Sequence, residues 1–368
     1  MTVARPISVL IVDDSAMVRK LLSMGFEADP RFRVVGTAAN VETAQRLLDE
    51  TAPDVVTLDV ELPHVDGLTW LKRIMATRPV PVVVISSLDR GSAEITMQAM
   101  ELGAVDVIAK PMGGVGAGLG QIIQDICARV GAAATARIDL AVAAPGRMAA
   151  RARPLWPSRN GQRVMGIGSS TGGVQALARI LPLVPADSPA ILIVQHMPEG
   201  FTASFAKRLD GLCAMEVREA RDGDLVQDGL VLIAPGGGRH MEVRRSGALY
   251  RVALVNGAPV CFSRPSVDVM LFSLAQAAGA NAVAAILTGM GRDGAKGLLR
   301  VREAGGRTIA QDAATCVVHG MPGVAAEIGA AQQILPLDAI PEAMQREPAF
   351  RQSETQATAP GALNRRPG

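Results

Sequence analysis

Short apolar runs alternate along the chain with longer segments in which apolar residues recur every three or four positions. The short runs predict buried β-strands, and the longer repeat predicts amphipathic helices. Across residues 1–131 the two patterns alternate five times, which predicts a parallel, doubly wound sheet of the flavodoxin-like (βα)5 type. The expected strands are Ile7–Val12, Arg33–Ala38, Val55–Leu58, Val82–Ile85 and Val105–Ile108. The expected helices are Ser15–Ala28, Val41–Glu50, Leu68–Met75, Ser92–Leu102 and Leu119–Val130.

The alternation stops at residues 132–162, which are rich in Ala, Arg, Pro and Gly and predict an interdomain linker. It resumes over residues 163–345 and predicts a second α/β domain, doubly wound and mainly parallel, with an antiparallel hairpin over Met241–Val255. The expected strands there are Val164–Ile167, Ala190–Gln195, Leu230–Ala234, Ala282–Leu287 and, as the last one, Arg307–Gln311. The expected helices are Gly173–Leu181, Ser266–Gly279 and one that ends at Glu303. Residues 346–368 are polar and predict a disordered tail.

Composition agrees with two domains of this kind. The 368 residues are 49% hydrophobic but only 3% aromatic, so the cores must be built from aliphatic side chains and Met. No apolar run approaches the length of a membrane span, so we expect a cytoplasmic protein without membrane insertion. Four cysteines without CxxC spacing or a neighbouring histidine predict reduced thiols and no zinc. The linker holds five Arg against one Asp and the tail four Arg against two Glu, so the two domains themselves are slightly acidic.

Polar side chains follow the expected strands of the first domain, at the sheet edge where doubly wound folds bind their ligands. Asp13 and Asp14 follow the first strand, and Asp59 follows the third. Ser86 follows the fourth strand, and Lys110, before Pro111, follows the fifth. Three carboxylates repel one another unless a cation lies among them, and hard oxygen ligands suit Mg²⁺. A carboxylate beside Mg²⁺, a hydroxyl and a lysine is equipped to accept a phosphoryl group.

The motifs around these residues resemble the response-regulator receiver domain. They are Val9–Ser15, Leu58–Pro63 with Asp66-Gly67, Ile85–Ser87 and Ala109–Pro111. The resemblance implies that Asp59 is the phosphoacceptor. It also implies that Asp14, Asp59 and the main-chain carbonyl of Glu61 bind Mg²⁺, next to Asp13, and that Ser86 and Lys110 contact the phosphoryl group.

The sequence departs from the receiver pattern at Val107. This residue stands three positions before Lys110, where the family usually has an aromatic switch residue. We therefore expect Ser86 and repacking of the helix from Ser92 to relay phosphorylation, with less help from the rotation of a ring.

The segment Gly166–Gly173 joins an apolar run to a helical one in the second domain. It contains G-x-S-x-G with Ser170 at the centre, a pattern that suits a sharp strand-to-helix turn with an exposed hydroxyl and backbone N–H groups beside it. A glycine-rich βα turn without chemistry explains the motif equally well. A phosphate-binding turn fits less well, because the third glycine of the dinucleotide fingerprint is missing.

A nucleophilic serine needs a base and an acid to orient it. The chain has four histidines, of which His64 lies in the first domain and His240 and His319 are expected at the rim of the second. His196 directly follows the next buried strand, so its ring should lie at the same sheet edge as Ser170. Asp293 follows another apolar strand at that edge and is the candidate acid. A Ser-His-Asp set there predicts acyl transfer, in a chain order that differs from that of the α/β-hydrolases.

The motifs of the second domain are similar to those of the chemotaxis protein-glutamate methylesterases. They are Gly168–Gly173, Gln195–Pro198, Ala234–Gly236, Arg264–Asp268, Leu287–Gly291 with Asp293-Gly294, and Ile309–Asp312. The resemblance covers nearly the whole chain and implies hydrolysis of glutamate γ-methyl esters, and deamidation of certain glutamines, on chemoreceptor helices. It implies a catalytic set of Ser170, His196 and Asp293, with the Met290 backbone N–H in the oxyanion hole and no cofactor in this domain.

The same resemblance implies partners and control. A chemotaxis histidine kinase would phosphorylate Asp59, and the unphosphorylated receiver would cover the active site of a monomeric enzyme. Thr171 and Gln195 would leave room for a receptor helix beside the serine. Two other functions remain as alternatives: a receiver-controlled DNA-binding regulator and a nucleotide-binding α/β domain. Residues 163–345 are too long for a helix-turn-helix and are not basic, and we expect no nucleic-acid partner.

Overall fold

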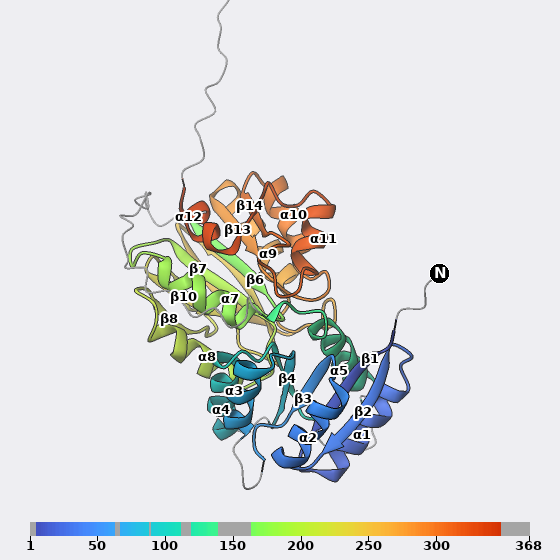
Figure 1. The fold of residues 1–368 in the computed structure, drawn as a ribbon. Coiled ribbons are helices and arrows are strands. Elements are labelled where there is room, and N and C mark those ends of the chain that lie inside the picture. Colours follow the sequence, from blue (N-terminus) through green and yellow to red (C-terminus); the bar gives the residue numbers. More distant parts are fainter. Residues whose placement is uncertain (1–4, 63–66, 88–89, 112–118, 139–162, 347–368) are drawn as a thin grey trace, which may run out of the picture.

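The structure is a computed structural model and describes residues 5–62, 67–87, 90–111, 119–138 and 163–346 (Figure 1). The first unit alternates strands and helices as expected, and its boundaries agree with the sequence prediction within a few residues. Its elements are β1 (Ile7–Val12), α1 (Ala16–Glu27), β2 (Phe32–Ala38), α2 (Val41–Thr51), β3 (Val55–Leu58), α3 (Gly67–Thr77), β4 (Val82–Ser86), α4 (Arg90–Glu101), β5 (Asp106–Ala109) and α5 (Leu119–Ala133). The strands pair in parallel in the order β2-β1-β3-β4-β5, so the predicted doubly wound sheet is confirmed.

The second unit is built around a parallel sheet of seven strands among the described residues, in the order β15-β14-β13-β6-β7-β10-β8. A small antiparallel sheet contains the predicted hairpin, β11 and β12, with β9 beside it. Its elements are β6 (Val164–Ser169), α7 (Gly173–Ile180), β7 (Ala190–Gln195), α8 (Phe201–Asp210), β8 (Glu216–Glu219), β9 (Leu225–Val226), β10 (Leu230–Ile233), β11 (His240–Ser246), β12 (Leu249–Val255), α9 (Val267–Ala278), β13 (Ala282–Ile286), α10 (Ala295–Glu303), β14 (Arg307–Gln311), α11 (Met321–Glu327), β15 (Gln333–Leu335) and α12 (Ile340–Gln345).

The expectation that Arg307–Gln311 is the last strand is wrong. The short edge strand β15 follows it and extends the sheet, but its three residues are largely exposed and carry no apolar run that sequence patterning detects. Helix α8 and strand β8 were not predicted either, although Phe201, Phe205 and Leu209 of α8 recur at helical spacing.

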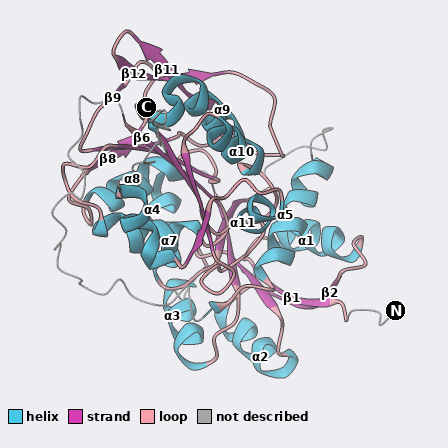
Figure 2. Cartoon of the chain, turned by 90° about the horizontal axis from the view of Figure 1, so that it is seen from above, coloured by secondary structure: helices cyan, strands magenta, loops and turns pink. Residues whose placement is uncertain are grey.

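Helices cover both faces of the seven-stranded sheet. Figure 2 shows α7 and α8 on one side of the strands and α9 and α10 on the other. Val174, Leu177 and Phe205 pack with one set of strand residues, and Met270 and Leu298 pack with the opposite set. The strands β6, β7 and β13 are therefore buried on both faces, and only their carboxyl ends are left for chemistry.

The two units contact each other through α4, which packs against α7 and α8 (Figure 1), and through a hydrogen bond between Asp106 of β5 and Thr171. Met97 and Met100 of α4 belong to the same apolar cluster as the core beneath α7 and α8. Glu101 at the end of α4 is paired with Arg208 of α8, and Glu94 lies 3.6 Å from Lys207. The contact is therefore apolar at its centre with ion pairs alongside.

None of the described helices is long and apolar enough to cross a membrane. The predicted tail beyond residue 346 and most of the predicted linker lie outside the described residues. The domain boundaries at residues 131, 163 and 345 remain predictions, although α5 continues to Ala133.

Candidate active site and receiver pocket

The turn that carries Ser170 lies at the centre of the large sheet. Strand β6 ends at Ser169, and Gly172 caps α7 with a positive φ of 78° that suits glycine. A side chain at Gly173 is excluded as well, because a Cβ there would lie 2.1 Å from the amide oxygen of Gln195. Ser170 is anchored by its backbone N–H, which donates to Thr288 at 3.0 Å. The small residues of the motif are therefore required by close packing at a strand-to-helix turn.

The structure distinguishes the two adjacent serines. The hydroxyl of Ser169 is fully buried and donates to Gln195 Oε1 at 2.6 Å. Ser170 is 6% exposed, and within the described residues its hydroxyl makes no hydrogen bond. Ser169 thus serves the packing of the turn, while the Ser170 hydroxyl is left for chemistry.

His196 and Asp293 are brought together as the sequence predicted. The imidazole Nε2 lies 2.9 Å from Asp293 Oδ2, with the histidine side chain 13% exposed and the aspartate 2%. His196 follows β7 directly beside the serine turn, since its backbone N–H donates to Ser169 at 3.1 Å. With Nε2 committed to the carboxylate, Nδ1 is the nitrogen that can accept a proton.

Asp293 is held by the start of helix α9. Its Oδ1 accepts the Ser266 hydroxyl at 2.8 Å and the Asp268 N–H at 3.0 Å, and its Oδ2 accepts the Val267 N–H at 2.8 Å. Burial alone would raise the pKa of this carboxyl. The His196 ring, the N–H groups and the Ser266 hydroxyl outweigh burial and hold the pKa below its ordinary value. The acid is therefore charged and fixed in orientation.

The loop after β13 lies against the serine. A Cβ added to Gly289 would come within 2.8 Å of Ser170 Cβ, so only glycine allows this approach. The next backbone N–H, that of Met290, donates to no acceptor within the described residues. This N–H has no acceptor in the described part of the chain and belongs to the residue after Gly289, which packs against Ser170.

Two hydroxyl groups that contact His196 and Asp293 were not predicted from the sequence, and one histidine was predicted in the wrong environment. Ser263 Oγ lies 3.4 Å from His196 Nδ1, and Ser266 binds Asp293 as described. His240 was expected at the rim but is 3% exposed, because its ring bridges the Ala258 carbonyl and the Ser266 N–H. His319 is exposed as expected, and His64 lies outside the described residues. A signal for Ser266 existed, since a serine before an apolar helix is a typical N-cap.

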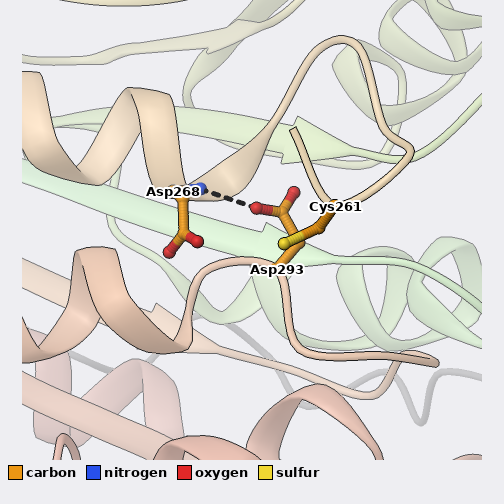
Figure 3. Close-up of side chains that lie close together, drawn as sticks. All are labelled: Cys261, Asp268 and Asp293. Carbon is orange, nitrogen blue, oxygen red and sulfur yellow. Dashed lines mark hydrogen bonds between the residues drawn. The ribbon is translucent and has the colours of Figure 1, made fainter. Parts of the chain in front are cut away.

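Figure 3 shows Cys261, Asp268 and Asp293 close together, with ligand atoms within 4.8 Å of one another. The two oxygens of Asp293 already accept four hydrogen bonds, from the donors named above and His196. Asp268 Oδ1 in turn accepts the Gly297 N–H at 2.7 Å. The carboxylate oxygens of this group are already used as hydrogen-bond acceptors within the protein, so the group does not fit a metal ion. The prediction of a catalytic domain without a cofactor remains a prediction.

The receiver pocket gathers the predicted carboxylates. The ligand atoms of Asp13, Asp14 and Asp59 lie within 4.8 Å of one another. Lys110 Nζ lies 2.6 Å from Asp59 Oδ2 and 3.4 Å from Asp13 Oδ2. Burial, with a smaller contribution from Asp59, raises the pKa of Asp13 to about 6 although Lys110 opposes it. The single positive charge of Lys110 does not compensate the negative charges of the three carboxylates. Their oxygen atoms are close enough together to suit a divalent cation.

Ser86 and Val107 occupy distinct surroundings. Ser86 Oγ accepts the Thr96 hydroxyl of α4 at 3.0 Å, which links the end of β4 to that helix. Ser92 of the same helix donates to Glu61 at 2.8 Å. Val107 is 1% exposed in the apolar core. The relay through Ser86 and α4 stays a prediction, for which these two hydrogen bonds supply a physical connection.

The receiver lies directly on the serine turn. Thr171 Oγ1 donates to Asp106 Oδ2 of β5 at 2.7 Å, and the Gly172 N–H donates to the Val105 carbonyl at 3.1 Å. Thr171 is 0% exposed and Gln195 is 1% exposed, since the first faces the receiver and the second is hydrogen-bonded to Ser169 and Ser170. The expectation that these residues leave room for a receptor helix applies to the enzyme with its receiver displaced, and it stays a prediction.

Comparison with known proteins matches both units. A family model described as response regulator receiver domain matches residues 9–115, and one described as CheB methylesterase matches residues 165–344. The chain is 60% identical, over 91% of its length and 90% of the relative, to the protein-glutamate methylesterase/protein-glutamine glutaminase of group 2 operon of Cereibacter sphaeroides. It is 50% identical to protein-glutamate methylesterase/protein-glutamine glutaminase 2 of Pseudomonas aeruginosa, over 95% and 99% of the two chains.

Proposed function

The chain belongs to the CheB methylesterase family and carries a response-regulator receiver domain, and on that premise we propose how its own residues perform and control the reaction. It is a protein-glutamate methylesterase and protein-glutamine glutaminase. It hydrolyses glutamate γ-methyl esters, and deamidates certain glutamines, on methyl-accepting chemoreceptors, which gives adaptation in chemotaxis. The single observation that carries the assignment of residues is the His196–Asp293 pair beside the Ser170 turn.

Ser170 is the nucleophile in this mechanism. Its Oγ attacks the γ-carbonyl carbon while its proton passes to His196 Nδ1, and Asp293 stabilises the imidazolium through Nε2. The backbone N–H of Met290 donates to the oxyanion of the tetrahedral intermediate. The imidazolium then protonates the methoxy oxygen of the ester, or the amide nitrogen of a glutamine, as its bond to the γ-carbon breaks; methanol or ammonia leaves and an acyl-enzyme remains. Water, deprotonated by the same imidazole, releases the glutamate product and restores the serine.

Asp59 is the phosphoacceptor of the receiver in this proposal. Receivers require Mg²⁺ for phosphorylation, and Asp14, Asp59 and the Glu61 carbonyl, next to Asp13, are the groups that would hold it. The ion supplies charge compensation for the phosphoryl oxygens when bound. Lys110 would neutralise a further phosphoryl oxygen, and the 2.6 Å distance from its ammonium to Asp59 supports this role. A chemotaxis histidine kinase is the phosphodonor.

The receiver controls access to the serine. Thr171 and Gly172, the two residues after Ser170, are bonded to β5 of the receiver. A receptor helix cannot approach the serine turn while those contacts persist. Phosphorylation draws Ser86 away from Thr96 and shifts α4, which weakens the contact of α4 with α7 and α8. The enzyme is therefore closed without phosphorylation and open with it.

Release of methanol from methylated receptor tests both parts. Ser170→Ala should be inactive with or without a phosphodonor, and Asp59→Asn should keep basal activity but show no response to the phosphodonor. Full activity in Ser170→Ala would refute the mechanism. Activation of Asp59→Asn by the phosphodonor would refute the switch. A salt-sensitive shift of DNA by the full chain would support the DNA-binding alternative instead.

A further inference from the structure

The turn Val260–Ser263 lies at the mouth of the active site and has a strained backbone. Val260 and Ser263 exchange two backbone hydrogen bonds, at 3.0 and 2.9 Å. Between them, Cys261 and Phe262 both have positive φ, 49° and 65°. Two-residue turns with this geometry favour Asn-Gly, and a bulky side chain in the left-handed region is an outlier. Strain of this kind persists where a function retains it.

The side chains on either side of Phe262 point toward the catalytic groups. Ser263 Oγ lies 3.4 Å from His196 Nδ1, and Cys261 Sγ lies within 4.8 Å of an Asp293 carboxylate oxygen (Figure 3). Phe262 is 82% exposed, in a chain with only seven phenylalanines. Its ring therefore gains little from folding and stands in solvent one residue from the contact with the catalytic base.

Two arginines complete the surroundings of the turn. The guanidinium of Arg264 donates to the carbonyls of Gly257 and Gly237 at 2.9 and 3.4 Å and so ties the turn to the neighbouring loops. Arg292 is exposed next to the Cys261 thiol, where it partly opposes the effect of burial on the thiol pKa. The aromatic ring is thus presented by an anchored loop, and an exposed positive charge lies next to Cys261, the residue before it.

We propose that Phe262 is a specificity-determining residue that packs against the apolar surface of the receptor helix which carries the reacting side chain. Arg292 meets a carboxylate on the same helix, since demethylation and deamidation both leave glutamates there. Aromatic and arginine side chains are the residues that most often dominate binding energy at protein interfaces. This inference rests on the proposed function and names how that site selects a protein helix.

The test separates binding from chemistry in the full-length, phosphodonor-activated enzyme. Phe262→Gly suits the left-handed backbone, so its Tm should equal or exceed that of the wild type. Its KM for methylated receptor should rise about tenfold, with kcat within twofold, while Phe262→Tyr keeps the ring and a KM close to wild type. Phe272→Ala, which truncates another exposed phenylalanine (42%) on α9, is the matched control and should leave KM unchanged.

A binding measurement makes failure of this inference distinguishable from failure of the proposed function. In the Ser170→Ala background, Phe262→Gly should weaken co-sedimentation with receptor by about tenfold. Unchanged KM and unchanged binding would overturn the role of Phe262, as would a fall in Tm without a change in KM. Methanol release that persists in Ser170→Ala would instead overturn the proposed mechanism.

Discussion

Replacing Gln175 by Glu should open the enzyme without phosphorylation. Gln175 on α7 donates through Nε2 to the carbonyls of Met100, at 3.1 Å, and Ala104 in the receiver. Glu has the same shape but no donor, so the closed state would press a carboxylate against two carbonyl oxygens. An unpaired buried charge costs about 3–5 kcal/mol. In the open state the carboxylate is hydrated and lies in the first turn of α7, where negative charge is favourable.

This energy acts on the closed state alone, so the open-to-closed ratio should rise by about 150-fold to about 5,000-fold. Basal methanol release should rise by that factor until the open form dominates. The assay is best made in the Asp59→Asn background, which excludes phosphorylation. Gln276→Glu adds the same charge at an exposed position of α9 and should leave the basal rate unchanged. A Gln175→Glu basal rate equal to that of Gln276→Glu would refute the reasoning.

The remaining predictions concern the serines, the switch and the acid of the triad. Ser170→Ala should lower kcat by more than about 10³-fold, whereas Ser169→Ala should stay active but lose about 1–3 kcal/mol of stability, measured by denaturant unfolding, because Gln195 Oε1 loses its donor. Val107→Ala should still be activated fully by a phosphoryl mimic if Ser86 and α4 carry the signal, and loss of activation would contradict that relay. The pKa of Asp293 lies below its unfolded value of 3.8, so its charge stabilises the fold above about pH 3.8 and this contribution is lost as pH falls through the folded pKa. The Tm difference between the wild type and Asp293→Asn should therefore shrink as the pH falls below about 3.8; a constant difference from there down to pH 2 would contradict this linkage.

The fold could be predicted from the sequence because buried parallel strands are continuous apolar runs. The carboxyl ends of such strands meet at one edge of a sheet, which is why His196 and Asp293 could be expected near the turn that carries Ser170. The catalytic roles of these three residues stay a prediction. The edge strand β15 has no such run and was missed. The receiver contact at Thr171 depends on two domains meeting, which no periodicity within either domain records.

The surroundings of the triad were also beyond sequence patterning. Ser263 reaches His196 only because the turn before α9 folds back over the site. His240 looked like a rim residue by its place after a glycine turn, yet its ring is used to hold the loop before α9. Isolated polar residues of this kind belong to no periodic pattern in the sequence. Their hydrogen-bond partners are therefore known only once the chain is folded.

The hydrogen bond between Thr171 and Asp106 couples the serine turn to the receiver. A receptor helix that approached this turn would have to displace β5, so an occupied site would also favour the receiver conformation that holds phosphate. By thermodynamic reciprocity, the factor by which phosphorylation tightens receptor binding equals the factor by which receptor favours the phosphorylated state. Densely packed, highly methylated receptors would then prolong the phosphorylated state of the receiver, and with it their own demethylation. A fluorophosphonate that labels serine nucleophiles would in turn read out, by its rate of labelling, how much of the enzyme is phosphorylated.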